Sequence, residues 1–327
     1  MSEPHPPYPD PARYARLMAE RDGFAFEDLD QGRGYLFRLS KAGRSFVSAA
    51  GAVCAYPINS ATAHGLARDK AHSKTLLQAA GVPCAPGRVF FLGGRFAALQ
   101  PADQGPDQAV AYAAGLGFPV FCKPNSGSRG DFAEPVSDAV ALQRYLSAVA
   151  ERYDMVLIEP LITAPECRVL SQDGRALCLV EKAEAVLTGD GQSPIGSLAQ
   201  AMNDRLALVG LSAVPEAVLA GLDQDQVLGV GDQVALAGRR NLSAGAEPGA
   251  VSLSVPPSLA EIAAKALEAL GLRLGAVDLF LTAEGPLVIE VNSNPAVTAL
   301  ERAGHLDVIL DLWRDMAEDL LATHGGR

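Results

Sequence analysis

Hydrophobic and polar positions along the chain follow two different periods, which predicts both helices and strands. Apolar residues recur at helical spacing in segments bounded by polar caps or glycine, and these predict helices at residues 69–81, 137–152 and 258–271. Short runs rich in β-branched and aromatic residues predict strands at residues 118–124 and 155–162, and two more within 166–186 around an Asp-Gly turn. This mixture predicts an α+β fold in which helices cover sheets.

The helix predicted at residues 258–271 has the clearest end signals. Ser258 is followed three residues later by Glu261, which is the pattern of a capping box. Gly271 is a typical terminator because glycine adopts the left-handed conformation that often follows a helix. We expect this helix to lead directly into a hairpin.

That hairpin is predicted at residues 275–295, GAVDLFLTAEGPLVIEVNSNP, with its turn centred on Glu284. Asp278 then lies opposite Glu290, and because side chains alternate between faces, both share a face with Asn292. Two carboxylates in this position repel each other, so a positive group should lie between them. Two interpretations remain open here. The oxygen groups suit Mg²⁺ together with substrate phosphates, or they are solvated charges on an exposed face.

Lys123 stands at the end of the strand predicted at residues 118–124 and opens a glycine-bearing loop with Gly127, Ser128 and Gly130. Backbone N–H groups of such a loop can surround phosphate oxygens while a lysine supplies a point charge. The alternative is a solvated lysine at a strand end.

Glu159 and Glu166 lie seven residues apart around a kink at Pro160. Such an edge could offer backbone groups to a purine ring, with one glutamate reaching an amino group and the other a ribose hydroxyl. The alternative is a pair of surface carboxylates.

Composition limits the classes of function. The chain has 327 residues, of which 49% are hydrophobic and 20% charged, as in ordinary globular proteins. A formal net charge of −11 without any Lys/Arg-rich run argues against nucleic acid or an anionic membrane as partner. No apolar run approaches the roughly 18 residues of a membrane span, and the start lacks a secretory pattern, so we expect a cytoplasmic protein.

Cysteine usage supports the same location. The five cysteines contain no CxxC pair, which indicates reduced thiols and argues against a disulfide framework or a zinc site. Cys122, Cys167 and Cys178 lie in strand-like sequence, so we expect them to be buried.

Four segments in a fixed order resemble the ATP-grasp superfamily of carboxylate–amine ligases. They are DKAHSKTLLQAAGVP, FPVFCKPNSGSRG, VLIEPLITAPECRV and VDLFLTAEGPLVIEVNSNP, spread over roughly residues 65 to 305. Between them, GDGQSPIGSL and LGVGDQVALAGRRNLSAGA are similar to the ATP-grasp module of cyanophycin synthetase and of fused glutathione-synthesising enzymes. The resemblance implies an ATP-grasp fold, with two α+β subdomains gripping ATP, over residues 67–322. This range includes an insert-like region at 186–235 and follows a partly flexible N-terminal segment at 1–66.

The resemblance also implies the site residues. Lys70 and Lys123 would face the ATP phosphates, Glu166 the ribose, and the stretch from Glu159 the adenine edge. The implied ATP-binding residues are Lys70, Lys123, Gly127, Ser128, Glu159, Pro160, Leu161, Ile162, Glu166 and Lys182. The implied catalytic residues are Arg240 or its neighbour Arg239, Asn241 and Lys123. The implied ligands of Mg²⁺, or of Mn²⁺ in its place, are Asp278, Glu290 and Asn292.

The activity implied is ATP-dependent formation of an amide or peptide bond on an amino acid or small peptide through an acylphosphate, with release of ADP and phosphate. The alternatives are a phosphotransferase that stops at a phosphorylated product, and a catalytically inactive nucleotide-binding protein. The first 65 residues are shorter than the substrate-side domain of many relatives. We therefore expect the substrate site to be completed by another subunit of a homo-oligomer or by residues 186–235.

Overall fold

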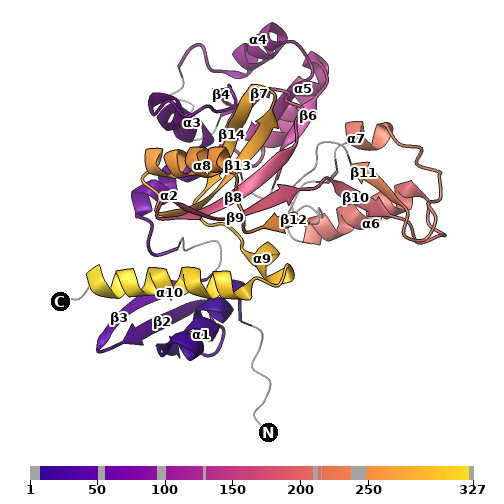
Figure 1. The fold of residues 1–327 in the computed structure, drawn as a ribbon. Helices are drawn as coiled ribbons and strands as arrows, with labels where there is room; N and C mark the ends of the chain where they lie inside the picture. The colour runs from indigo at the N-terminus through magenta and orange to yellow at the C-terminus, as the bar shows by residue number, and fades with distance from the viewer. Residues whose placement is uncertain are drawn as a thin grey trace.

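The computed structural model combines helices with four antiparallel sheets in its described part (Figure 1). It describes residues 8–50, 56–93, 101–127, 130–208, 213–214, 216–236 and 248–323. The mixture of helices and antiparallel sheets confirms the predicted α+β class.

The N-terminal elements pack with the last helix. These elements are α1 (Asp10–Asp22), β1 (Ala25–Asp28), β2 (Leu36–Lys41), β3 (Arg44–Ala49) and α10 (Leu306–Thr323), here called the terminal unit. The strands form one sheet in the order β1-β2-β3. Trp313 of α10 is 1% exposed, and its ring centroid lies 6.1 Å from that of Phe37 in β2. The beginning and the end of the described chain therefore share one apolar core.

A four-stranded sheet follows, in the order β4-β7-β5-β6. Its strands are β4 (Arg88–Phe91), β5 (Val120–Pro124), β6 (Glu134–Val136) and β7 (Met155–Pro160). Helices α4 (Pro106–Leu116) and α5 (Ala139–Ala150) pack on it around a core that includes Phe90, Cys122 and Leu142. The predicted helix at residues 137–152 is thus confirmed as α5.

Two helices precede this sheet, α2 (Ala61–Arg68) and α3 (Lys70–Ala79). The carboxylate of Asp69 accepts a hydrogen bond from the backbone N–H of His72 and caps α3. Gly81, with φ of 69°, follows the end of α3. The helix predicted at residues 69–81 is therefore confirmed.

The larger sheet has five strands in the order β12-β9-β8-β13-β14. They are β8 (Glu166–Gln172), β9 (Arg175–Lys182), β12 (Pro248–Ser252), β13 (Leu274–Thr282) and β14 (Gly285–Asn292). Residues such as Val169 and Val277 pack under α8 (Pro257–Ala269). Leu170 and Ala276, on the other face, join the core of α9 (Thr298–Arg302) and α10. The sheet is therefore covered on both faces.

The hairpin β13–β14 has the predicted register where it matters for the site. Asp278 pairs with Glu290, and Ala276 with Asn292. Nearer the turn the register shifts, because a bulge at Ile289 makes Leu279 pair with Val288. The turn therefore consists of two residues, Ala283 and Glu284, rather than being centred on Glu284.

The capping box predicted for α8 is wrong. The helix begins at Pro257, and its N-cap is Pro256, which makes no side-chain capping bond. Proline is favoured in the first helical position because its φ is already helical and it has no N–H to satisfy. Ser258 therefore lies inside the first turn, two positions after the N-cap.

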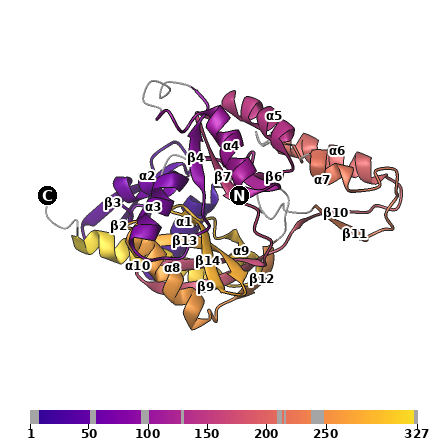
Figure 2. The ribbon, with the colours of Figure 1, turned by 90° about the horizontal axis from the view of Figure 1, so that it is seen from above.

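The described residues between 185 and 236 form a lobe that projects from the rest of the molecule (Figures 1 and 2). It contains β10 (Ala185–Thr188), α6 (Ile195–Leu208), α7 (Glu216–Ala220) and β11 (Gln233–Leu236). A small core of its own, which includes Leu187, Ile195, Met202 and Leu236, holds it together.

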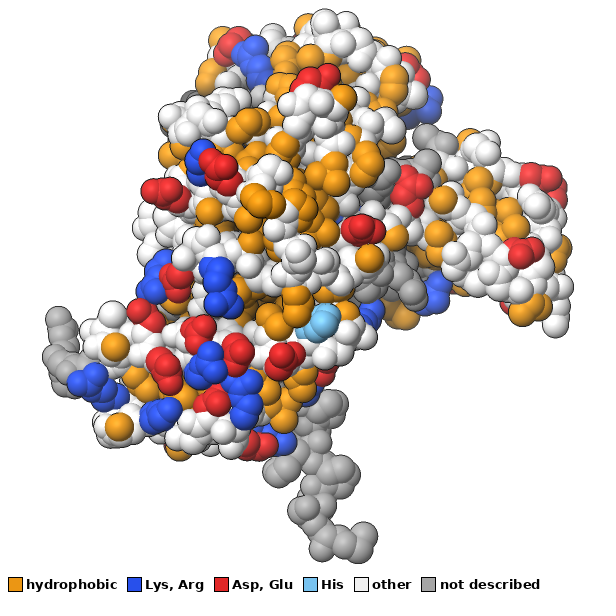
Figure 3. Space-filling view, in the orientation of Figure 1, with side chains coloured by type: hydrophobic (Ala, Val, Ile, Leu, Met, Phe, Trp, Pro, Cys, Tyr) orange, Lys and Arg blue, Asp and Glu red, His pale blue; other side chains and the backbone are white. Residues whose placement is uncertain are grey.

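The surface of the terminal unit carries acidic and basic side chains that are intermixed on the face seen in Figure 3. Asp311 of α10, for example, pairs with Arg21 at 2.8 Å and with Arg314 at 2.9 Å. In the part of the chain that the structure describes, no helix has both the length and the apolar character needed to cross a membrane.

Candidate active site

Two buried lysines share the carboxylate of Glu159 on the four-stranded sheet. Lys123 Nζ lies 2.7 Å from Glu159 Oε2, and Lys74 Nζ lies 2.6 Å from Oε1. All three side chains are at most 7% exposed. Lys74, in α3, also donates to the carbonyl of Ala85. Neither Lys123 nor Glu159 is therefore the solvated surface group of the alternative interpretation.

Ion pairing keeps these buried groups charged. Burial alone would lower the pKa of Lys123, but the carboxylates of Glu159 and Glu290 outweigh it and raise that pKa. Burial would likewise raise the pKa of Glu159, and Lys123 and Lys74 instead lower it. For Lys70, burial dominates and lowers the pKa, although Glu290 opposes this effect. Glu290, on the other sheet, thus lies within electrostatic reach of both Lys70 and Lys123.

The glycine-bearing loop after β5 meets the N-terminus of α3. Lys70 Nζ donates to the carbonyl of Gly127 at 2.6 Å. The backbone N–H groups of Lys70 and Ala71 donate to the backbone carbonyl and the side-chain oxygen of Asn125, at 3.1 and 2.9 Å. The structure therefore brings Gly127 beside Lys70, whereas Ser128 lies outside the described residues.

On the five-stranded sheet, Asp278 is fully buried and bound by two cationic side chains. Arg168, directly opposite on β8, donates to its two oxygens at 2.7 and 2.9 Å. Lys182 Nζ donates to it at 2.6 Å. Burial would raise the pKa of Asp278, but Arg168 and Lys182 hold that pKa well below its usual range. The positive charge expected beside this carboxylate therefore comes, in this structure, from the protein itself.

Glu290 and Asn292 differ from Asp278 in being partly exposed. The side-chain amide of Asn292 lies 3.4 Å from Glu290 Oε1. Carboxylate and amide oxygens are the donors that Mg²⁺ prefers, so these two residues fit the metal that the fold family implies. Asp278 fits as a ligand only if Arg168 or Lys182 moves away. Among the described residues, no group of three His, Cys, Asp or Glu side chains is placed to hold a metal ion.

Of the other predicted residues, some lie in the described part of the chain and some lie outside it. Pro160 ends β7, and Leu161 and Ile162 continue the chain from Glu159, with Leu161 exposed. Glu166 lies 3.6 Å from Lys182, and both face the Asp278 cluster. The predicted catalytic residues Arg240 and Asn241, together with Arg239, lie outside the described residues.

Sequence analysis missed Lys74 and Arg168. Lys74 stands four residues after Lys70, one helical turn away on the same face, which was a usable signal. Arg168 alternates with Glu166 on β8 and therefore shares its face. The ladder that sets Arg168 against Asp278 joins strands 110 residues apart in the chain, which no local pattern predicts.

Comparison with known proteins found similar sequences and a similar fold. Residues 222–316 match the model of the RimK-like ATP-grasp domain. Cyanophycin synthetase from Geminocystis herdmanii is 27% identical over 252 residues, which cover 70% of this chain and 28% of that protein. A probable alpha-L-glutamate ligase from Legionella pneumophila is 32% identical over 78 residues, which cover 23% of this chain and 26% of that protein.

Among solved structures, the bifunctional glutathione synthetase from Pasteurella multocida superimposes with a TM-score of 0.53 at 18% identity, over 92% of this chain and 44% of that one. The matches thus span less than a third of the two sequence relatives and less than half of the structural one. At this identity, the structural likeness supports the fold alone. The chain has the ATP-grasp fold, and residues 222–316 are similar to the RimK-like ATP-grasp domain.

Proposed function

We propose that this protein is an ATP-dependent ligase that joins the carboxylate of an amino acid or small peptide to an amine. The observation that carries the proposal is the placement of buried, charged Lys123 and of Lys70 within electrostatic reach of Glu290. Cations from β5 and α3 that face metal-binding oxygens of β14 are what a nucleoside triphosphate with its metal requires. The relatives are named as a synthetase and a ligase, which supports the same class of reaction.

The proposed reaction has two steps, a phosphoryl transfer followed by attack of the amine. A carboxylate oxygen of the substrate bonds to the γ-phosphorus of ATP, and ADP leaves with the electrons of the broken P–O bond. The amine nitrogen then bonds to the acyl carbon, phosphate leaves with the C–O bond electrons, and the nitrogen loses its extra proton to solvent. The protein contributes positioning and charge compensation to the first step, since negative charge spreads over the transferring phosphoryl oxygens.

Each residue of the site has a role in this scheme. Lys70 and Lys123 would compensate phosphate charge, and the raised pKa of Lys123 keeps it protonated at neutral pH. Glu290 and Asn292 would hold Mg²⁺, which supplies further charge compensation at the phosphates when bound. Since the carboxylate of Glu159 is committed to two lysines, we assign the adenine contacts to the backbone of residues 160–162. Glu166 remains our candidate for the ribose.

The test is to incubate the purified protein with MgATP, a panel of amino acids and dipeptides, and a range of amines. A ligase releases ADP and phosphate only when both substrates are present, and hydroxylamine traps the acylphosphate as a hydroxamate. A phosphotransferase instead forms ADP without an amine and retains a phosphorylated product. Binding of ATP without ADP formation under any condition would favour the inactive nucleotide-binding protein.

Glu290→Gln should abolish ADP formation while the protein folds normally. The side chain is partly exposed, and the substitution keeps its shape while it removes one charge at the metal-binding position. Glu284→Gln is the matched control, because Glu284 is exposed at the turn of the same hairpin. Wild-type turnover in Glu290→Gln would contradict the metal assignment.

A further inference from the structure

The side chain of Asn59 ties the start of β13 to the residue that follows Asn292. Its Nδ2 donates to the carbonyls of Leu274, at 2.7 Å, and Ser293, at 3.2 Å. Its Oδ1 accepts from the backbone N–H groups of Arg273 and Leu274, at 3.0 and 3.1 Å. One amide thus uses all its hydrogen-bonding capacity on two segments more than 200 residues away in the chain.

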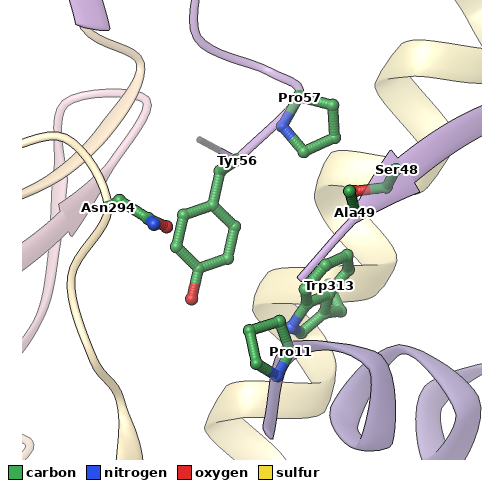
Figure 4. A pocket seen from close by; sticks show the side chains of 7 residues that line it. All are labelled: Pro11, Ser48, Ala49, Tyr56, Pro57, Asn294 and Trp313. Atoms are coloured by element: carbon green, nitrogen blue, oxygen red, sulfur yellow. The ribbon is translucent and has the colours of Figure 1, made fainter. Parts of the chain in front are cut away.

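Two neighbours of Asn59 hold the same loop after β14. His64 Nδ1 lies 2.8 Å from the hydroxyl of Ser293, which is only 4% exposed as a residue. The hydroxyl of Tyr56 donates to the carbonyl of Pro295 at 3.4 Å. Figure 4 shows the ring of Tyr56 between Asn294 and Trp313, and the Tyr56 and Trp313 ring centroids lie 5.6 Å apart. Residues 56–64 therefore hold the loop at two residues, Ser293 and Pro295, through three hydrogen-bond contacts.

The same segment also leads to the phosphate-facing side of the site. Ser60 caps α2 by accepting from the backbone N–H of Ala63 at 3.1 Å. Helix α2 ends at Arg68, one residue before Asp69, which caps α3. Lys70 is the first residue of α3. Residues 56–64 therefore connect the backbone after Asn292 with the helix that carries Lys70.

We propose that Asn59, assisted by His64, is a positioning residue that holds the end of β14 so that Glu290 and Asn292 keep their metal-binding arrangement. The proposal rests on the proposed function, because it concerns the same metal position. Asn59 acts through the backbone. It bonds to Ser293, the residue after Asn292, and to Leu274 at the start of β13, two residues before Ala276, which pairs with Asn292. A role of this kind should change metal affinity, whereas a purely structural role should change stability alone.

The test is Asn59→Asp, which keeps the shape and the two acceptor contacts but replaces both donated hydrogen bonds by repulsion between oxygens. Metal affinity is measured by calorimetry with Mn²⁺ as the probe, in the presence of ADP, and by the Mg²⁺ concentration that gives half-maximal ADP formation. Loss of a residue that orients a metal ligand typically weakens metal affinity 10- to 100-fold, and we expect a loss of about tenfold here. Gln143→Glu, which makes the same charge change on the exposed face of α5, should leave both values unchanged.

His64→Ala provides a second, independent variant, for which we expect a smaller loss of several-fold in Mn²⁺ affinity. If Asn59→Asp does not fold, the Mn²⁺ affinity of His64→Ala tests the proposal by itself. Weaker Mn²⁺ binding in either folded variant supports the proposal, and Mn²⁺ binding within twofold of wild type in every folded variant overturns it, whatever their melting temperatures. The proposed function fails by a different result, in which wild-type protein binds Mn²⁺ and ATP but forms no ADP with any substrate pair.

Discussion

At the scale of single residues, each of the two buried carboxylates in the site binds two cations. Glu159 binds Lys74 and Lys123, and Asp278 binds Arg168 and Lys182. Removing charges from water is costly, and one carboxylate compensates only one of its two partners. The Glu159 cluster therefore keeps an excess of positive charge that an anionic ligand would balance, whereas Glu166, 3.6 Å from Lys182, offsets the second cation of the Asp278 cluster.

Lys123→Ala should weaken ATP binding and also destabilise the fold. Among the described residues, it leaves the buried carboxylate of Glu159 with Lys74 as its one remaining partner in an ion pair. Breaking a buried ion pair costs roughly 3–5 kcal/mol when one partner is left alone. Because Lys74 remains, we expect about 2–3 kcal/mol in urea unfolding. The double variant with Glu159→Gln should recover part of this stability but not the ATP affinity. Wild-type stability and affinity in Lys123→Ala would mean that the lysine is solvated.

The hydrogen bonds to Glu301 allow a prediction of how the stability of the fold depends on pH. Arg13 donates to its two oxygens at 2.7 and 2.5 Å and Tyr14 donates at 2.6 Å. These bonds, that from Arg13 first, lower the pKa of Glu301 to about 2. Because the folded-state pKa lies below the ordinary value of 4.5, the stabilisation is complete above that value and is lost as pH falls toward 2.

Glu301→Gln should therefore melt below wild type at pH 7, and the gap should narrow between about pH 5 and pH 2. Melting curves recorded across this range check the prediction, with Glu284→Gln as the control for an exposed carboxylate. A gap that stays constant with pH would show that the ionised carboxylate adds no stability.

At the scale of elements, the helices and strands that were predicted correctly are those whose signals lie within a few neighbouring residues. The pairing of Asp278 with Glu290 was predicted correctly although the turn was not, because the bulge at Ile289 offsets the difference between the predicted and the observed turn. The bulge at Ile289 was missed because an extra residue leaves no trace in an apolar run. Helix α1 was missed because Pro9 and Pro11 resemble an extended lead-in, although Pro11 lies in its first turn.

The contacts within the site depended on pairing between distant strands and were not predictable in the same way. Alternation alone places Arg168 and Asp278 each on one face of its own strand. Their direct contact needs the ladder between β8 and β13. The site residues were therefore identified by resemblance and alternation, whereas the partners of Glu159 and Asp278 emerged from the tertiary fold.

Gly275→Ala tests how closely elements approach at the start of β13. A Cβ atom there would lie 2.6 Å from the Leu267 side chain and 3.0 Å from the carbonyl of Asn292. Overpacking of this kind costs about 1–3 kcal/mol, and we expect that loss in denaturant unfolding. Gly65→Ala in α2, where a Cβ would meet no atom within 4 Å, should instead stabilise by about 0.5–1 kcal/mol. Equal effects at both positions would contradict the close approach.

At the scale of the whole molecule, the candidate site draws on both large sheets. Lys123 and Glu159 come from the four-stranded sheet, and Asp278, Glu290 and Asn292 come from the five-stranded one. The bridge between Cys84 and Val288 joins the two parts, with Ala85 N–H donating to the Val288 carbonyl at 2.9 Å. A ligand that contacts both sheets would therefore stabilise their relative position, a contribution that neither sheet supplies alone.

MgATP should accordingly raise the melting temperature of the entire sheet assembly. A ligand that binds only the folded chain stabilises it by about 2.7 kcal/mol at a hundredfold excess over its dissociation constant. Glu290→Gln should keep a shift with ATP in the presence of a chelator, because Lys70 and Lys123 remain, but should lose the additional shift that Mg²⁺ provides. Thermal unfolding of both proteins, with ATP alone and with MgATP, separates the two contributions. A wild-type protein whose melting temperature moves with neither would have no nucleotide site between its sheets, because binding at that position cannot leave the folding equilibrium unchanged.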